Sequence, residues 1–125
     1  MKKTVSSGKL PAAVGPYSHA AWAGEFLYCS GQLGIDPATG ALASESIAAQ
    51  AKQALENIKA LLESQGLFPS DVVKSMVFLS DIGNFKVFNE VYGEYFAADP
   101  PPRSCVAVAG LPLGALVEIE VIAHR

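Results

Sequence analysis

The sequence predicts an α+β fold in which a mixed sheet carries two helices packed on one of its faces. Three observations point to this fold: two amphipathic stretches with helical spacing, a C-terminal stretch that alternates between apolar and mostly polar residues, and short apolar segments bounded by glycine or proline. The predicted order is strand, strand, helix, strand, helix, strand, strand. No repeat, low-complexity tract or linker divides the 125 residues, so we expect a single domain spanning residues 1–125.

The first two strands are predicted at residues 17–23 and 26–30, which are rich in aromatic and apolar residues. Gly24-Glu25 between them suits a hairpin turn. Gly31 then leads into a turn-rich loop at residues 36–40.

Two helices follow from apolar residues at helical spacing. The first is predicted over residues 46–65, capped by Ser44 or Ser46 and ended by Gly66. The second is predicted over residues 84–97, and the three prolines at 100–102 stop it because they exclude the helical conformation.

Three further strands are predicted at residues 72–80, 104–108 and 117–124, the last two joined by a turn at 110–114. In the last strand Val117, Ile119, Val121 and Ala123 point to one face, and Glu118, Glu120, Ile122 and His124 to the other.

Only 17% of the residues are charged, and two helices on one face leave the other face uncovered. We therefore expect an oligomer that buries this face.

Composition excludes several classes of function. The net charge is −3 and no basic cluster follows Lys2-Lys3, so a nucleic-acid partner is not expected. The longest apolar run, residues 105–117, is interrupted by glycine and proline and falls short of the about 18 residues of a membrane span. With no targeting signal and two widely spaced cysteines, we expect a cytoplasmic protein with reduced thiols.

Cofactor and metal motifs are equally absent. The sequence contains no glycine-rich dinucleotide motif and no phosphate loop. His19 and His124 are 105 positions apart, and the spacing of Cys29 and Cys105 does not resemble a zinc site. We therefore expect neither a metal nor a cofactor.

Three residues near the C-terminus could carry chemistry. Arg103 either anchors a carboxylate with its planar guanidinium or forms a surface ion pair with Asp99 or Glu120; taken alone, the ion pair is favoured. Glu118 lines a cavity or an interface, or faces solvent; desolvation would raise its pKa and suit it to proton transfer. Cys105, on the face of Arg103, suits a pocket-lining thiol better than a nucleophile, because no histidine neighbours it in sequence.

Two further candidates are open to both structural and functional interpretations. Tyr17, after Gly15-Pro16, either offers a phenol at a pocket mouth or packs. Asn89 lies among aromatic residues in the second helix and either faces solvent or bonds a neighbouring chain. The aromatic stripe around it is interpreted as core.

Taken together, these residues resemble the RidA/YjgF family. The match includes the arginine-bearing motif of the RidA subgroup and covers almost the whole chain. The motifs that carry it are Gly15-Pro16-Tyr17-Ser18, Cys29-Ser30-Gly31-Gln32, Asn89, Pro102-Arg103-Ser104-Cys105-Val106 and Val117-Glu118-Ile119-Glu120.

The resemblance implies a chorismate-mutase-like fold assembled as a homotrimer with ligand sites between subunits. It also implies cofactor-free hydrolysis of 2-iminobutanoate and 2-iminopropanoate to 2-oxo acids and ammonia, which protects the pyridoxal-phosphate enzymes that release these imines. The family alternatives are a non-catalytic binding or chaperone-like trimer and a ribonuclease or translation inhibitor. The acidic pI of about 5.3 weighs against the last of these.

Site residues follow from the resemblance by position. Arg103 would bind the substrate carboxylate and Glu118 would position or activate water. The pocket would be lined by Tyr17, Ser30, Gly31, Asn89 and Cys105, some of them from the adjacent subunit. His19 departs from the family pattern, because many members have glutamine there.

Overall fold

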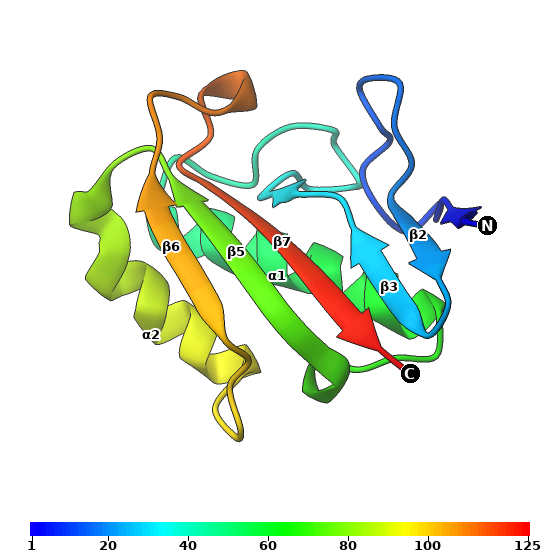
Figure 1. Ribbon diagram of the computed structural model, residues 1–125. Helices are drawn as coiled ribbons and strands as arrows, with labels where there is room; N and C mark the ends of the chain where they lie inside the picture. The colour runs from blue at the N-terminus through cyan, green and yellow to red at the C-terminus, as the bar shows by residue number, and fades with distance from the viewer.

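A computed structural model describes all 125 residues as one seven-stranded sheet with two helices behind it. Both helices cover the same face of the sheet, and the opposite face carries no helix (Figure 1). The elements are β1 (Lys3–Val5), β2 (Ala20–Ala23), β3 (Phe26–Cys29), β4 (Gln32–Leu33), α1 (Ile47–Ser64), β5 (Val72–Leu79), α2 (Phe85–Tyr95), β6 (Arg103–Ala107) and β7 (Val117–His124). The predicted mixed α+β fold is confirmed.

The strand order is β1-β2-β3-β7-β5-β6, and β4 also pairs with β7. All neighbours are antiparallel except β5 and β6, which are parallel and joined through α2. β7 therefore lies inside the sheet and β6 forms one of its edges. This arrangement decides where the candidate residues end up, because Arg103 opens the edge strand and Glu118 lies on the inner strand.

The bounds predicted for 26–30, 46–65, 72–80 and 104–108 differ from the observed ones by one residue at one or both ends, and the structure corrects the prediction further at three places. Residues 17–19 were expected in a strand but lie in a loop, and β2 begins only at Ala20. β1 and β4 were not predicted at all, since three and two residues are too short to show a period. α2 ends at Tyr95 rather than at residue 97, because Phe96 leaves the helical conformation and turns its ring into the core.

The helices form where the sequence supplies caps and an apolar stripe. Ser46 caps α1, its hydroxyl accepting the Ala49 N–H at 3.1 Å, and Gly66 follows the helix with a φ of 74° that glycine adopts without strain. Leu55 and Ile58 are among the predicted inward residues and are fully buried. Neither α1 nor α2 has the combination of length and apolar composition that a membrane crossing would need.

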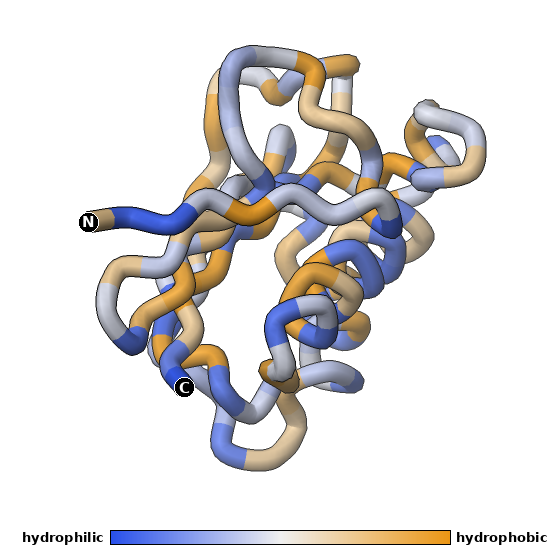
Figure 2. Tube along the Cα trace, turned by 90° about the vertical axis from the view of Figure 1, so that its right-hand side faces the viewer, coloured by the Kyte–Doolittle hydropathy of each residue, from blue (hydrophilic) through white to orange (hydrophobic).

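The core fills the space between the helices and the sheet, where apolar segments of both layers face each other (Figure 2). The alternation predicted for β7 is confirmed: Val117 and Ile119 are buried, whereas Glu118 and Glu120 are partly exposed on the open face. Burying one apolar side chain of this kind contributes about 1.5–3 kcal/mol to the stability of the folded protein. The helix-covered face of β7 thus holds the fold together and its open face is available for a site.

Candidate functional site

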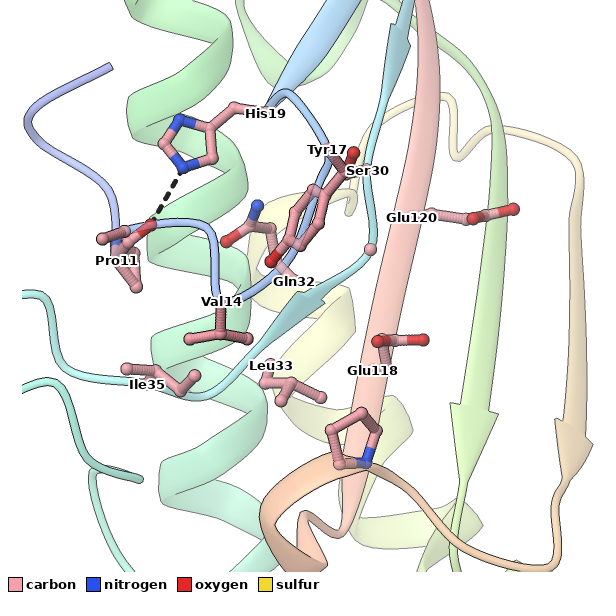
Figure 3. A pocket seen from close by; sticks show the side chains of 13 residues that line it. Pro11, Val14, Tyr17, His19, Ser30, Gln32, Leu33, Ile35, Glu118 and Glu120 are labelled. Atoms are coloured by element: carbon pink, nitrogen blue, oxygen red, sulfur yellow. Dashed lines mark hydrogen bonds between the residues drawn. The ribbon is translucent and has the colours of Figure 1, made fainter. Parts of the chain in front are cut away.

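A cleft of about 420 Å³ lies between the loop before β2, β4 and β7 (Figure 3). It brings together four of the predicted residues, Tyr17, Ser30, Gly31 and Glu118, although they come from distant parts of the sequence. The complete lining is Pro11, Ala12, Val14, Tyr17, His19, Ser30, Gly31, Gln32, Leu33, Ile35, Pro112, Glu118 and Glu120.

Glu118 enters the cleft because β4 pairs with β7, opposing Leu33 to Glu118. The adjoining Gly31 lets the carboxyl group approach the backbone closely: a Cβ at this position would lie 2.8 Å from the Glu118 Cδ. Burial, and secondarily the charge of Glu120, raise the pKa of the Glu118 carboxyl. A carboxyl whose pKa moves toward neutrality suits transfer of a proton to or from water.

Ser30 and Tyr17 both line the cleft, Tyr17 from the loop before β2 and Ser30 from the segment after β3. The Ser30 hydroxyl donates to the Ser18 carbonyl at 2.6 Å, and the Ser30 N–H donates to the His19 carbonyl at 2.9 Å. Ser30 therefore ties the end of β3 to the loop. Tyr17 remains about half exposed with its ring toward the cleft (Figure 3), in agreement with a phenol at the mouth of a pocket.

His19 holds the same loop from the interior. Its Nδ1 accepts the Ser7 N–H at 3.0 Å, and its Nε2 lies 2.9 Å from the Pro11 carbonyl (Figure 3). Both contacts are satisfied only by a neutral ring with its proton on Nε2, which donates to Pro11. His19 is thus a loop anchor, a role that sequence reasoning missed because both partners are backbone atoms without a sequence signal.

Arg103 lies outside this cleft, at the edge of the sheet. Its guanidinium carbon is 4.7 Å from the ring centroid of Tyr92, 5.7 Å from that of Phe85 and 5.8 Å from that of Phe88. These rings lie on α2, on the helix-covered side of the sheet. The distances fall within the range of cation–π attraction.

Arg103 makes no ion pair and donates no side-chain hydrogen bond within the chain. The one ion pair in the structure joins Arg125 to Glu25 at 3.1 Å. The alternative of a surface pair between Arg103 and Asp99 or Glu120 is therefore wrong for this chain. The guanidinium of Arg103 thus rests on aromatic rings with its N–H donors free. Such a group can bind an anion that is not part of this chain.

Cys105 shares the face of Arg103, as predicted. Arg103 is opposite Ser75 and Cys105 is opposite Val77 in the parallel pairing of β6 with β5, and both partners are buried under the helices. Burial raises the pKa of the Cys105 thiol although the charge of Arg103 lowers it. The group is thus held as a thiol at neutral pH, which fits a lining residue better than a nucleophile.

Asn89 lies on α2 near the same edge. It is four residues after Phe85 and three before Tyr92, so it shares their side of the helix. Its side chain is partly exposed and makes no hydrogen bond in the chain. Its amide remains available to a ligand or to another chain.

The predicted residues therefore form two groups that do not meet within one chain. Glu118, Gly31, Ser30 and Tyr17 belong to the open side of the sheet. Arg103, with Cys105 and Asn89, belongs to the helix side of the edge strand. No group of three or more His, Cys, Asp or Glu side chains lies close enough together to hold a metal ion.

Fold and site together define a small α+β protein with two polar half-sites, one presenting a free arginine and the other a carboxyl of raised pKa. The family model described as Endoribonuclease L-PSP matches residues 7–125. The chain belongs to this family, which is the RidA/YjgF family that the sequence motifs resemble.

Relatives and solved structures match the chain over nearly its whole length. A RutC family protein of Pyrococcus horikoshii is 46% identical over 100% of this chain and 99% of its own. A Bos taurus protein named 2-iminobutanoate/2-iminopropanoate deaminase is 47% identical over 98% of this chain and 90% of its own.

The crystal structure of RidA from the Antarctic bacterium Psychrobacter superposes with a TM-score of 0.94 at 47% identity, covering 98% of this chain and 99% of that one. The structure of E. coli TdcF with bound serine has a TM-score of 0.93 at 39% identity, covering 98% of both chains.

Proposed function

We propose that this protein hydrolyses the C=N bond of small 2-imino acids, with 2-iminobutanoate and 2-iminopropanoate as its substrates, and so protects the pyridoxal-phosphate enzymes that release them. The observation that carries the proposal is Arg103, a supported guanidinium without an acidic partner. Two comparisons support it: the bovine relative bears the name of this deaminase, and TdcF was crystallised with serine, an amino acid whose carboxylate matches that of the substrate.

In the proposed reaction Arg103 binds the substrate carboxylate with two parallel N–H donors. Holding the substrate in this way supplies orientation, the main requirement for an imine that is already electrophilic when protonated. Glu118 takes a proton from water as the water oxygen bonds to the carbon of the protonated imine, and then gives this proton to the nitrogen of the resulting carbinolamine. The C–N bond breaks as the carbinol O–H gives its proton to Glu118, leaving a 2-oxo acid and ammonia, and Glu118 then loses this proton to ammonia or solvent. General acid–base assistance of this kind contributes roughly 10²–10⁴-fold.

The two half-sites meet, in this proposal, between chains of a homotrimer. Arg103 and Glu118 lie on opposite sides of the sheet, so one chain does not offer both to one small substrate. The open face also exposes apolar side chains, among them Tyr28 and Val106, which a second copy would cover. The number of chains in the proposed assembly comes from the family resemblance.

The activity is tested by supplying a threonine dehydratase with threonine and following the loss of the imine with and without this protein. We expect acceleration by the wild type, none by Arg103→Ala, and little by Arg103→Lys, because lysine keeps the charge but loses the planar fork. Arg125→Ala is the matched control. This other arginine also lies over a ring, 4.4 Å from the centroid of Trp22, but at the far end of β7.

Absence of acceleration by the wild type would refute the deaminase. Binding of 2-oxobutanoate without turnover would instead support a non-catalytic binding protein that uses the same arginine.

The shared site is tested by mixing two inactive variants, Arg103→Ala and Glu118→Gln, after unfolding and refolding them together. If each site takes Arg103 from one chain and Glu118 from the next, about a quarter of the sites in a random mixture are intact and activity returns. Sites built within one chain would leave the mixture as inactive as its parents.

A further inference from the structure

Three rings on α2, those of Phe85, Phe88 and Tyr92, form an aromatic shelf beneath Arg103. We infer that this shelf fixes the direction of the Arg103 guanidinium before a ligand arrives, and that Tyr92 is the positioning residue of the anion site. The inference rests on the proposed role of Arg103 as a carboxylate anchor and adds the residues that hold the anchor in place.

The helix builds the shelf from its own period. Positions 85, 88 and 92 are separated by three and four residues, so their side chains lie on one side of α2. Tyr92 is nearest to the guanidinium carbon, and the other two rings are about 1 Å further away. Phe88 and Tyr92 are buried and in mutual ring contact at 5.5 Å, which gives Arg103 a rigid support.

Tyr92 is itself fixed to the strand beside Arg103. Its hydroxyl lies 2.7 Å from the hydroxyl of Ser75, a fully buried residue opposite Arg103 in the parallel register. The Ser75 N–H also donates to the Pro102 carbonyl at 3.1 Å, just before Arg103. Ser75 therefore contacts both the Tyr92 hydroxyl of the shelf and the backbone next to Arg103. These contacts fix the position of the shelf relative to Arg103 when the chain folds.

This arrangement has a kinetic consequence. A free arginine loses rotamer freedom when it binds an anion, whereas an arginine already held on a support loses less. Because the carboxylate is bound both before and during the reaction, weaker support raises KM and leaves kcat nearly unchanged. From the usual strength of cation–π contacts we expect Tyr92→Leu to raise KM about three- to thirtyfold.

The variants are chosen to separate positioning from packing. Tyr92→Phe keeps the ring, still packed against Phe88 and Phe96, but loses the hydroxyl contact with Ser75; it should lower the free energy of unfolding and keep KM within about twofold of the wild type. Phe96→Leu is the matched packing control, because this ring is equally buried and packs against Tyr92 with ring centroids 4.6 Å apart but is not among the rings over Arg103. It should lower stability with KM unchanged. Phe85→Leu removes a partly exposed ring and should raise KM with little loss of stability.

An assay without turnover keeps this inference separate from the proposed function. The chemical shift of the Arg103 Nε–H, measured by NMR in the absence of ligand, reports the ring currents of the shelf. The Kd for 2-oxobutanoate reports the anion site. We expect Tyr92→Leu to move the Nε–H signal toward the value of a free arginine and to weaken binding by the same factor as KM.

The inference is overturned if folded Tyr92→Leu and Phe85→Leu bind 2-oxobutanoate as the wild type does, or if their Arg103 signal does not move. If the signal and the Kd change as expected while no variant or wild type hydrolyses imines, the shelf stands and the deaminase proposal fails.

Discussion

Replacing Gly31 with alanine tests whether the position of Glu118 matters for activity. The backbone of Gly31 is not in the left-handed region, so alanine can adopt it, and the effect of the change comes from space alone. The added Cβ would lie 2.8 Å from Cδ, 3.0 Å from Cγ and 3.1 Å from Oε2 of Glu118. Ordinary contact begins at 3.4 Å, so the carboxyl group has to move by about 0.6 Å.

The size of the effect follows from this displacement. A misplacement of 1 Å in a reacting group can cost about 10²-fold in rate, so a shift of about 0.6 Å predicts a fall in kcat/KM of roughly tenfold, or about 1.4 kcal/mol. The free energy of unfolding should fall by only about 1 kcal/mol, because the atoms displaced are the end of a flexible side chain. The assay is steady-state imine hydrolysis together with urea unfolding.

Two other glycines serve as controls. Gly93→Ala meets no atom within 4 Å and should stabilise α2 by about 0.5–1 kcal/mol without changing activity. Gly34→Ala would instead collide with the backbone carbonyl of Gln50, and should prevent normal folding. If Gly31→Ala keeps the kcat/KM of the wild type, the reasoning that ties activity to the place of Glu118 is refuted.

Two further substitutions test the raised carboxyl pKa and the support of the cleft. A carboxyl whose pKa is raised by folding stabilises the protein most below its unfolded pKa and loses that contribution as pH rises through its folded pKa. Glu118→Gln should therefore resist urea better than the wild type at neutral pH, with the advantage vanishing in acid; an equal advantage at every pH would contradict this. The Asn57 amide donates to the carbonyls of Leu33 at 3.3 Å and Ile35 at 2.9 Å. Asn57→Leu removes both bonds and should lower the free energy of unfolding by about 2–4 kcal/mol, whereas unchanged urea unfolding would show that these bonds contribute little.

The sequence predicted well the helices and strands that are long enough to repeat an apolar pattern several times. Such an element has one apolar face that is buried in the core. α1 and β7 met this condition, and β7 was predicted with its observed bounds, 117–124. β4 did not, since its two residues form a strand only by pairing with β7, nearly ninety positions later in the chain. A short segment of this kind carries no period of its own.

The two groups of candidate residues show the same limit. Motif resemblance predicted roles for Arg103 and Glu118, and alternation placed each on a face of its own strand. Which sides of the sheet these faces become depends on the parallel register of β6 with β5 and on the path of α2. The aromatic stripe around Asn89 was interpreted as core, and Phe88 and Tyr92 are indeed buried. Their second contact, with Arg103, is set by the tertiary packing of α2 against the sheet.

The central place of β7 has a consequence for the order of folding. β3, β4 and β5 all hydrogen-bond to this strand, yet residues 117–124 are synthesised after every one of them. Until they emerge from the ribosome, the hairpin of β2 and β3 and the unit of β5, α2 and β6 share no strand. α1 then has only part of the sheet on which to bury its apolar side. Such long-range pairing slows folding. We therefore expect chaperones to bind the nascent chain until β7 pairs with β3, β4 and β5 and completes the sheet.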